Sequence, residues 1–249
     1  MCLILFAYRA NPGVDLLVAA NRDEFHGRAS AAADFWQDTP QVLAGRDLEA
    51  GGTWLGCDLG GRFAALTNFS RPEDGPARSS RGRLVQDFLQ GTADADTYAE
   101  QIDYAAYAGF NLLLFDGETL FYASNKADNQ TLAPGVYGLS NAELGAEWPK
   151  CMLGASGLAN LAARTYAAEP LLALLGDRRI PPDSELPQRG RDIELERRTA
   201  SCFITGDEYG TRASTIVRIS NSEVDFTEQL FAAGGAIGER NTYRFTRAG

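Results

Sequence analysis

The stretch "MCLILFAYRANPGVDLLVAANRDEF" (residues 1–25) contains two apolar runs joined by a turn signal. The runs at 2–9 and 14–20 are rich in residue types that favour strands, and "NPG" at 11–13 is typical of a turn. The segment therefore predicts an antiparallel β-hairpin. Because both runs are almost continuously apolar, we expect both faces of this sheet to be covered by other layers.

Further along the chain, strand and helix patterns come in alternating groups. Tight turns such as "DGET" separate most of the strand candidates and favour antiparallel pairing. This order favours two packed sheets with helices on their outer faces over a doubly wound parallel sheet. The predicted strands lie at 62–69, 109–117, 119–124, 135–141, 201–205, 214–219 and 224–231, the predicted helices at 81–91, 95–105 and about 158–175, and a charged, proline-rich, exposed loop at 178–192.

Composition sets limits on the class of protein. A chain of 249 residues suits one large core, so we expect a single domain over 1–249. The formal net charge of −10 argues against nucleic acid or an anionic membrane surface as a partner. The opening run at 2–8 is too short for a signal peptide or a membrane span, which predicts a cytoplasmic protein. Four separated cysteines and one histidine give no ligand set for a metal site.

Cys2 follows the initiator methionine and is a candidate nucleophile. In a hairpin turning near residue 12, residues 2 and 22 are equidistant from the turn, which places Cys2 beside Arg22 and Asp23. A small second residue permits removal of Met1, and the exposed α-amine, with an ordinary pKa of about 7.7 to 8.0, can then act as a base. The alternative is a buried cysteine at the start of a strand, followed by a charged turn.

An ordered set of motifs resembles a known family. These motifs are "ANRDEF" at 20–25, "GGTWLG" at 51–56, "ALTNF" at 65–69, "GVYGLSN" at 135–141 and "LERRTASCFITGDEYGTRASTIV" at 195–217. Together they resemble the NRDE family, also called the transport and Golgi organization 2 family, over nearly the whole chain. That family is placed among the N-terminal-nucleophile hydrolase-like proteins, so the resemblance implies an α+β fold, a four-layer αββα sandwich.

The chain is also similar to the cysteine amidases of the penicillin V acylase and bile-salt hydrolase type. The resemblance implies that Cys2 attacks an amide carbonyl, Asp23 orients its amine and Arg22 polarises its thiol. It also implies that Asn68 and Asn141 stabilise the oxyanion, and it aligns Arg212 with a distal arginine of those enzymes. The amidases separate their arginine and aspartate by a few residues, whereas the adjacent Arg22 and Asp23 point to opposite faces of a strand.

Four more residues of these motifs are predicted to bind the ligand: Asn21, Thr53, Trp54 and Phe69. Structural alternatives stay open for several residues. Asn68 and Asn141 suit strand ends, Arg212 suits an ion pair with Asp207 or Glu208, and Trp54 suits the core.

Two classes of function remain open at this point. The first is a hydrolase or acyltransferase with Cys2 as nucleophile, acting on a small amide or acyl compound. The second is a non-catalytic protein that binds or carries haem or a lipid-related ligand, although the single histidine and two methionines offer few haem ligands. No other cofactor is expected, and the sequence leaves the oligomeric state open.

Overall fold

Two antiparallel sheets form the centre of the computed structural model, which describes residues 2–69, 77–164, 166–187, 190 and 192–248. The six-stranded sheet has the order β10-β1-β2-β11-β12-β13. Its strands are β1 (Cys2–Asn11), β2 (Val14–Phe25), β10 (Gly135–Leu139), β11 (Tyr209–Ile219), β12 (Glu223–Phe231) and β13 (Ile237–Thr246).

The seven-stranded sheet follows chain order from β3 to β9. Its strands are β3 (Ser30–Phe35), β4 (Val42–Asp47), β5 (Leu55–Asp58), β6 (Phe63–Asn68), β7 (Phe110–Phe115), β8 (Leu120–Ser124) and β9 (Gln130–Thr131). All neighbouring pairs in this sheet are antiparallel, including β6 and β7, which are joined by the segment that carries α1 and α2.

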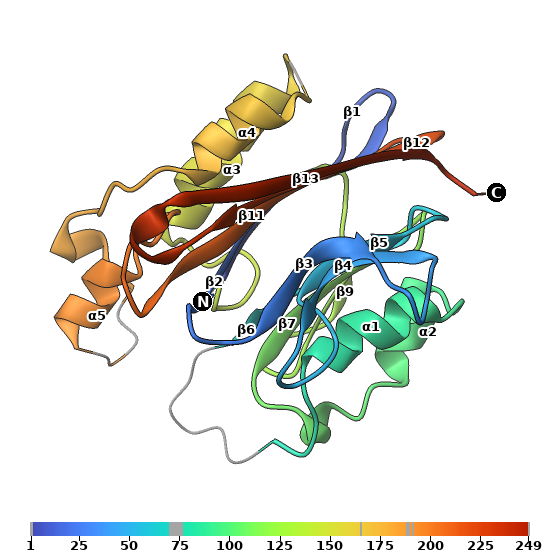
Figure 1. Cartoon of the computed structure of the whole chain (residues 1–249), viewed down its shortest axis with the longest axis horizontal. Helices are drawn as coiled ribbons and strands as arrows, with labels where there is room; N and C mark the ends of the chain where they lie inside the picture. The colour runs from blue at the N-terminus through green and yellow to red at the C-terminus, as the bar shows by residue number, and fades with distance from the viewer. Residues whose placement is uncertain (1, 70–76, 165, 188–189, 191, 249) are drawn as a thin grey trace.

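Helices cover the outer face of each sheet (Figure 1). Helices α1 (Gly82–Gln90) and α2 (Ala95–Glu100) pack on the seven-stranded sheet, whereas α3 (Pro149–Ala162) and α4 (Ala168–Leu175) pack on the six-stranded sheet. The remaining helical segments are α5 (Ile193–Arg198) and three short 3₁₀ turns at Tyr104–Ala106, Asp183–Glu185 and Ala233–Gly235. The predicted α+β fold, a four-layer αββα sandwich, is confirmed.

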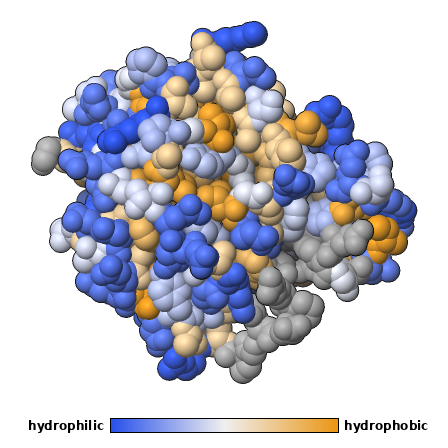
Figure 2. All heavy atoms as spheres, turned by 180° about the vertical axis from the view of Figure 1, so that it is seen from behind, coloured by the Kyte–Doolittle hydropathy of each residue, from blue (hydrophilic) through white to orange (hydrophobic). Residues whose placement is uncertain are grey.

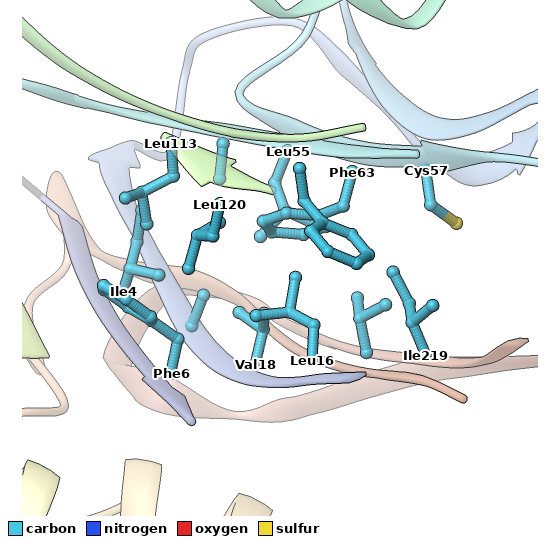
Figure 3. Packing of buried hydrophobic residues seen from close by; sticks show 14 of the residues in the cluster. Ile4, Phe6, Leu16, Val18, Leu55, Cys57, Phe63, Leu113, Leu120 and Ile219 are labelled. Atoms are coloured by element: carbon cyan, nitrogen blue, oxygen red, sulfur yellow. The ribbon is translucent and has the colours of Figure 1, made fainter. Parts of the chain in front are cut away.

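Alternation along β1 explains why the opening run is apolar on both sides. Ile4 and Phe6 point into the core between the two sheets, where they meet residues such as Phe63 of the opposite sheet (Figure 3). Leu3 and Leu5 point the other way and pack against the helix layer of α3 and α4. Burial of successive residues on opposite faces therefore produces the continuous apolar run.

Some sequence-based boundaries were wrong. Residues 201–205 form no strand; 201–204 are buried, and Cys202 packs beneath the helix layer instead of joining a sheet. The helix predicted at about 158–175 is two helices, α3 and α4, and α3 begins nine residues earlier than predicted. Strands β3, β4, β5, β9 and β13 were missed. Parts of the predicted loop at 178–192 lie outside the described residues.

Hydrophilic residues cover most of the face seen from behind, and apolar residues gather near its middle (Figure 2). Over the described ranges, the longest helix, α3, has 14 residues, and none is both long and apolar enough to cross a bilayer.

Candidate active site

Cys2 begins β1 and lies directly opposite Arg22 of β2, so the predicted register is confirmed. Residues opposite each other on antiparallel strands project to the same face of the sheet. Both side chains line a cavity of about 260 Å³. The other lining residues include Asp23, Asn68, Thr53 and Trp54, together with 79–82, which lead into α1.

The main chain of Cys2 is held by the end of β10. The backbone N–H of Cys2 donates to Asn141 Oδ1 over 3.3 Å, and Ser140 Oγ donates to the Cys2 carbonyl over 2.8 Å. Asn141 Nδ2 in turn donates to the Asn68 carbonyl over 2.6 Å. Asn141 therefore connects Cys2 to the end of β6 in the opposite sheet and fixes the position of the Cys2 nitrogen.

Asp23 is buried on the other face of β2. Its Oδ1 accepts a hydrogen bond from the Thr211 hydroxyl over 2.6 Å, and its backbone carbonyl accepts one from the Tyr209 hydroxyl over 3.0 Å. Burial raises the pKa of Asp23, while the charge of buried Lys150 on α3 and the Thr211 hydrogen bond act in the opposite direction. Arg22 and Asp23 thus point to opposite faces, as expected, and both still reach the cavity near the end of the strand.

The Cys2 thiol lies in surroundings that favour its protonated form. Burial raises the pKa of the Cys2 thiol, and the charge of Asp23 raises it further. A hydrogen bond from the Asp23 backbone and the charge of Arg22 lower the thiol pKa and only partly offset the effect of burial. A thiol of this kind needs a nearby base to become a nucleophile near neutral pH.

Arg22 stacks on Trp54, which belongs to the loop between β4 and β5 of the opposite sheet. The guanidinium carbon lies 4.0 Å from the ring centroid, and Arg22 is only 7% exposed. Burial lowers the pKa of Arg22 from its ordinary value. This contact places Trp54 in the cavity wall, where it shapes both the core edge and the space above Cys2.

Four predicted site residues lie outside the cavity lining: Asn21, Phe69, Asn141 and Arg212. Asn21 faces the helix layer, where Nδ2 donates to the carbonyls of Leu175 and Cys202 and Oδ1 accepts from Ser214. Phe69 is buried, with 5% of its surface exposed.

Arg212 is the extra residue of a β-bulge, where the pairing of β11 with β2 shifts between Thr211 and Ala213. Its guanidinium donates to the carbonyls of Phe25 and Arg28, at the turn that follows β2. The bulge therefore directs this side chain to the turn, where it holds the main chain.

Sequence reasoning missed three polar partners of the predicted residues: Ser140, Lys150 and Thr211. Ser140 and Thr211 each stand directly beside a residue that was predicted. Since side chains alternate along a strand, a motif alone does not show which of two neighbours faces the site. Within the described ranges, no cluster of three or more histidine, cysteine or acidic residues has the geometry of a metal site.

The raised pKa of Asp23 predicts a pH-dependent contribution to stability. Its ordinary value is 3.8, so the folded chain keeps this proton to higher pH than the unfolded chain does. The stabilising contribution is therefore present below the ordinary pKa and is lost as the pH rises through the raised one. The measurement is the free energy of unfolding from urea titrations at several pH values. We expect the value for the wild type minus the value for Asp23→Asn to fall as the pH rises from the ordinary pKa of Asp23 through the raised one.

Asp38→Asn is the control for this experiment, because hydrogen bonds from Arg46 lower the pKa of Asp38. The contribution of Asp38 is present above its ordinary pKa and is lost as the pH falls, so the difference has the opposite slope. An Asp23→Asn difference that is flat across this range would contradict the prediction.

Comparison with known proteins gives three findings. The family model described as Transport and Golgi organisation 2 matches residues 1–233. The Transport and Golgi organization 2 homolog of Mus musculus is 34% identical to this chain over 273 residues. The Transport and Golgi organization protein 2 homolog of Homo sapiens is 36% identical over 275 residues. Each alignment covers 99% of both chains. Among solved structures, the Caenorhabditis elegans ortholog of N-acylethanolamine-hydrolyzing acid amidase matches with a TM-score of 0.51 and 10% identity, over 86% of this chain and 91% of that one.

Proposed function

The chain belongs to the Transport and Golgi organisation 2 family and has an N-terminal-nucleophile hydrolase-like fold, and we propose that it is an N-terminal-cysteine hydrolase or acyltransferase acting on a small amide or acyl compound. One observation carries this proposal. The Cys2 nitrogen is held by Asn141 at 3.3 Å, while the thiol of the same residue lines a cavity beside Asp23. The solved neighbour is named for hydrolysing an amide, but at 10% identity it supports the fold alone.

Removal of Met1 converts the Cys2 nitrogen into a primary amine at the same position. The neutral amine accepts the thiol proton, and the resulting thiolate attacks the carbonyl carbon of the substrate. Asn141 Oδ1 accepts a hydrogen bond from the amine and Asp23 orients it. Arg22 lowers the pKa of the thiol through its charge.

Collapse of the tetrahedral intermediate completes the first half of the reaction. The amide side chains of Asn141 and Asn68 stabilise the oxyanion. Asn68 lines the cavity, and Asn141 contacts it from behind, using one N–H on the Asn68 carbonyl and keeping a second for this role. The leaving nitrogen takes the proton from the Cys2 ammonium, and a thioester on Cys2 remains.

Water, or an acyl acceptor, then releases the acyl group. The Cys2 amine takes a proton from the incoming nucleophile, which attacks the thioester carbonyl, and the thiolate leaves and regains that proton. The cavity of about 260 Å³ is slightly smaller than most small-molecule sites, which suits a compact substrate. Thr53 and Trp54 line this space and are its ligand-binding residues in this scheme. Asn21, Phe69 and Arg212 support the surrounding main chain.

Retention of Met1 is expected to abolish activity, because an amide nitrogen has no basic lone pair. The measurement compares two preparations of the same chain, with Met1 retained or removed, as established by intact mass. Each is incubated with p-nitrophenyl esters and p-nitroanilides of short acyl chains. We expect a mass increase of one acyl group at Cys2, followed by turnover, only after removal of Met1.

The two preparations differ by one residue and so control for folding and for other thiols. Equal turnover by both would overturn the proposed base. If neither preparation is acylated at Cys2, the hydrolase proposal fails as a whole.

A further inference from the structure

Arg22 is a buried cation that faces the candidate nucleophile without an anionic partner. Over the described residues its guanidinium makes no hydrogen bond and no ion pair, and it contacts the opposite sheet through the stack on Trp54. A guanidinium has five N–H donors, and a buried charge is ordinarily paired and hydrogen-bonded. Since Arg22 is 7% exposed and lines the cavity above Cys2, its free donors point to a missing acceptor.

The acidic groups around the cavity have other partners. Asp47 pairs with Arg28 at 2.9 Å, and Asp23 accepts from Thr211 on the opposite face of β2. Glu24 accepts a hydrogen bond from the backbone N–H of Phe25. Among the described residues no carboxylate forms an ion pair with Arg22, although the charges of Glu24 and Asp47 raise the pKa of Arg22 and the charge of Arg22 lowers the pKa of buried Glu228.

The stack on Trp54 leaves the guanidinium prepared for an anion. The guanidinium carbon lies over the Trp54 ring, 4.0 Å from its centroid, and the N–H donors of a guanidinium point outward in the plane of the group. Such an edge binds a carboxylate or a phosphate in bidentate fashion. Because Arg22 and Cys2 lie opposite each other, an anion bound there is only a few bonds from a carbonyl held at the thiol.

We propose that the compound cleaved at Cys2 carries a carboxylate or phosphate group a few bonds from the scissile carbonyl, and that Arg22 binds this group. The proposal rests on the function proposed above and names the class of its substrate. Neutral amides of the same size offer an uncharged acceptor and leave the charge of the guanidinium unpaired.

Matched ligands test this assignment. Binding is measured by calorimetry and tryptophan fluorescence on the Cys2→Ala chain, which holds ligands without cleaving them. The probes are N-hexanoylglycine, its neutral carboxamide N-hexanoylglycinamide, and N-hexanoyl phosphoethanolamine. We expect an anionic probe to bind at least about 30-fold more tightly than the carboxamide, as for a buried charge pair. The carboxylate and phosphate probes separate the two anion sources.

Variants of Arg22 show whether it is the group responsible. Arg22→Met keeps much of the stem and removes the charge, so the preference is expected to disappear. Arg22→Lys keeps a point charge but loses the bidentate donor geometry of the guanidinium, so it is expected to retain part of the preference for anionic probes. Arg46→Met is the control and leaves the preference unchanged, because Arg46 lies outside the cavity lining and pairs with Asp38. Circular dichroism establishes that each variant is folded, and Arg22→Lys keeps the test valid if Arg22→Met does not fold.

Two results would overturn the assignment. One is equal binding of anionic and neutral probes to the Cys2→Ala chain. The other is an equal loss of turnover for anionic and neutral amides in Arg22→Lys, which would mean that Arg22 acts on the thiol alone. A chain that binds anionic probes through Arg22 and never cleaves them would refute the proposed hydrolase while keeping the anion site.

Discussion

Replacement of Cys2 with alanine is expected to lower kcat for a cleaved amide by at least about 10³-fold, with no comparable loss of binding. The thiol is the group that forms the bond to the substrate, and the alanine side chain offers no nucleophile. Since Cys2 is only partly buried, the loss of one sulfur atom leaves little internal space. The measurement is kcat of the Met1-free chain, with ligand affinity measured in parallel.

Cys151→Ala is the matched control for the loss of a thiol. Cys151 is buried on α3, outside the cavity lining, and burial raises the pKa of its thiol to about 11. This variant is expected to keep full activity. If Cys2→Ala turns over amides as fast as the wild type, the cavity belongs to a binding protein and not to a thiol-dependent enzyme.

Gly52→Ala is expected to reduce the free energy of unfolding by about 3 kcal/mol, through two additive effects. Gly52 has a φ of +74°, a conformation that costs a residue with a Cβ. In addition, a Cβ at this position meets the carbonyl of Gly82 at 2.4 Å. Because both contacting atoms belong to backbone, neither can move without displacing the start of α1.

The neighbouring glycine separates these two effects. Gly51 has a φ of +71°, but a Cβ placed there meets nothing within 4 Å. Gly51→Ala therefore carries the conformational cost alone, about 1 kcal/mol. Urea denaturation of both variants measures the difference, and equal destabilisation would show that the close approach to Gly82 contributes nothing.

The close approach of Gly52 to Gly82 also links the stability of the fold to the candidate active site. Thr53, the next residue, donates its backbone N–H to the Gly82 carbonyl over 3.1 Å, and both residues line the cavity. A displaced loop also moves Trp54 and the guanidinium that stacks on it. Gly52→Ala is accordingly expected to weaken ligand binding as well as folding.

The elements that could be predicted have strong local signals. The hairpin of β1 and β2 combines two apolar runs with a short turn, and its register followed from counting residues to that turn. Strand β3, in contrast, reads "SAAADF" and has little β-branched or aromatic content, so it gives a weak local signal. The stretch at 201–205 misleads in the opposite way, because the apolar character of 201–204 reflects burial, with Cys202 beneath the helices, and not strand pairing.

Likewise, the sequence predicts the position of some site residues and misplaces others. Cys2, Arg22 and Asp23 follow from the hairpin, because one register places all three at the same end of the sheet. Asn21 belongs to the same motif but points into the helix layer, and the bulge in β11 directs Arg212 toward the turn after β2. A bulge changes which face a residue occupies, and its position depends on the partner strand.

The sequence by itself determined the hairpin, the layered α+β arrangement and the position of Cys2 opposite Arg22, because periodicity and turn residues act over short distances along the chain. Only the tertiary structure decided that Asn141 holds the Cys2 nitrogen and that Trp54 stacks on Arg22. Both contacts join segments far apart in sequence. The first lies at the end of the neighbouring strands β1 and β10 of one sheet, and the second joins the two sheets. They depend on long-range strand pairing and on how the sheets pack against each other, and no local pattern encodes that geometry.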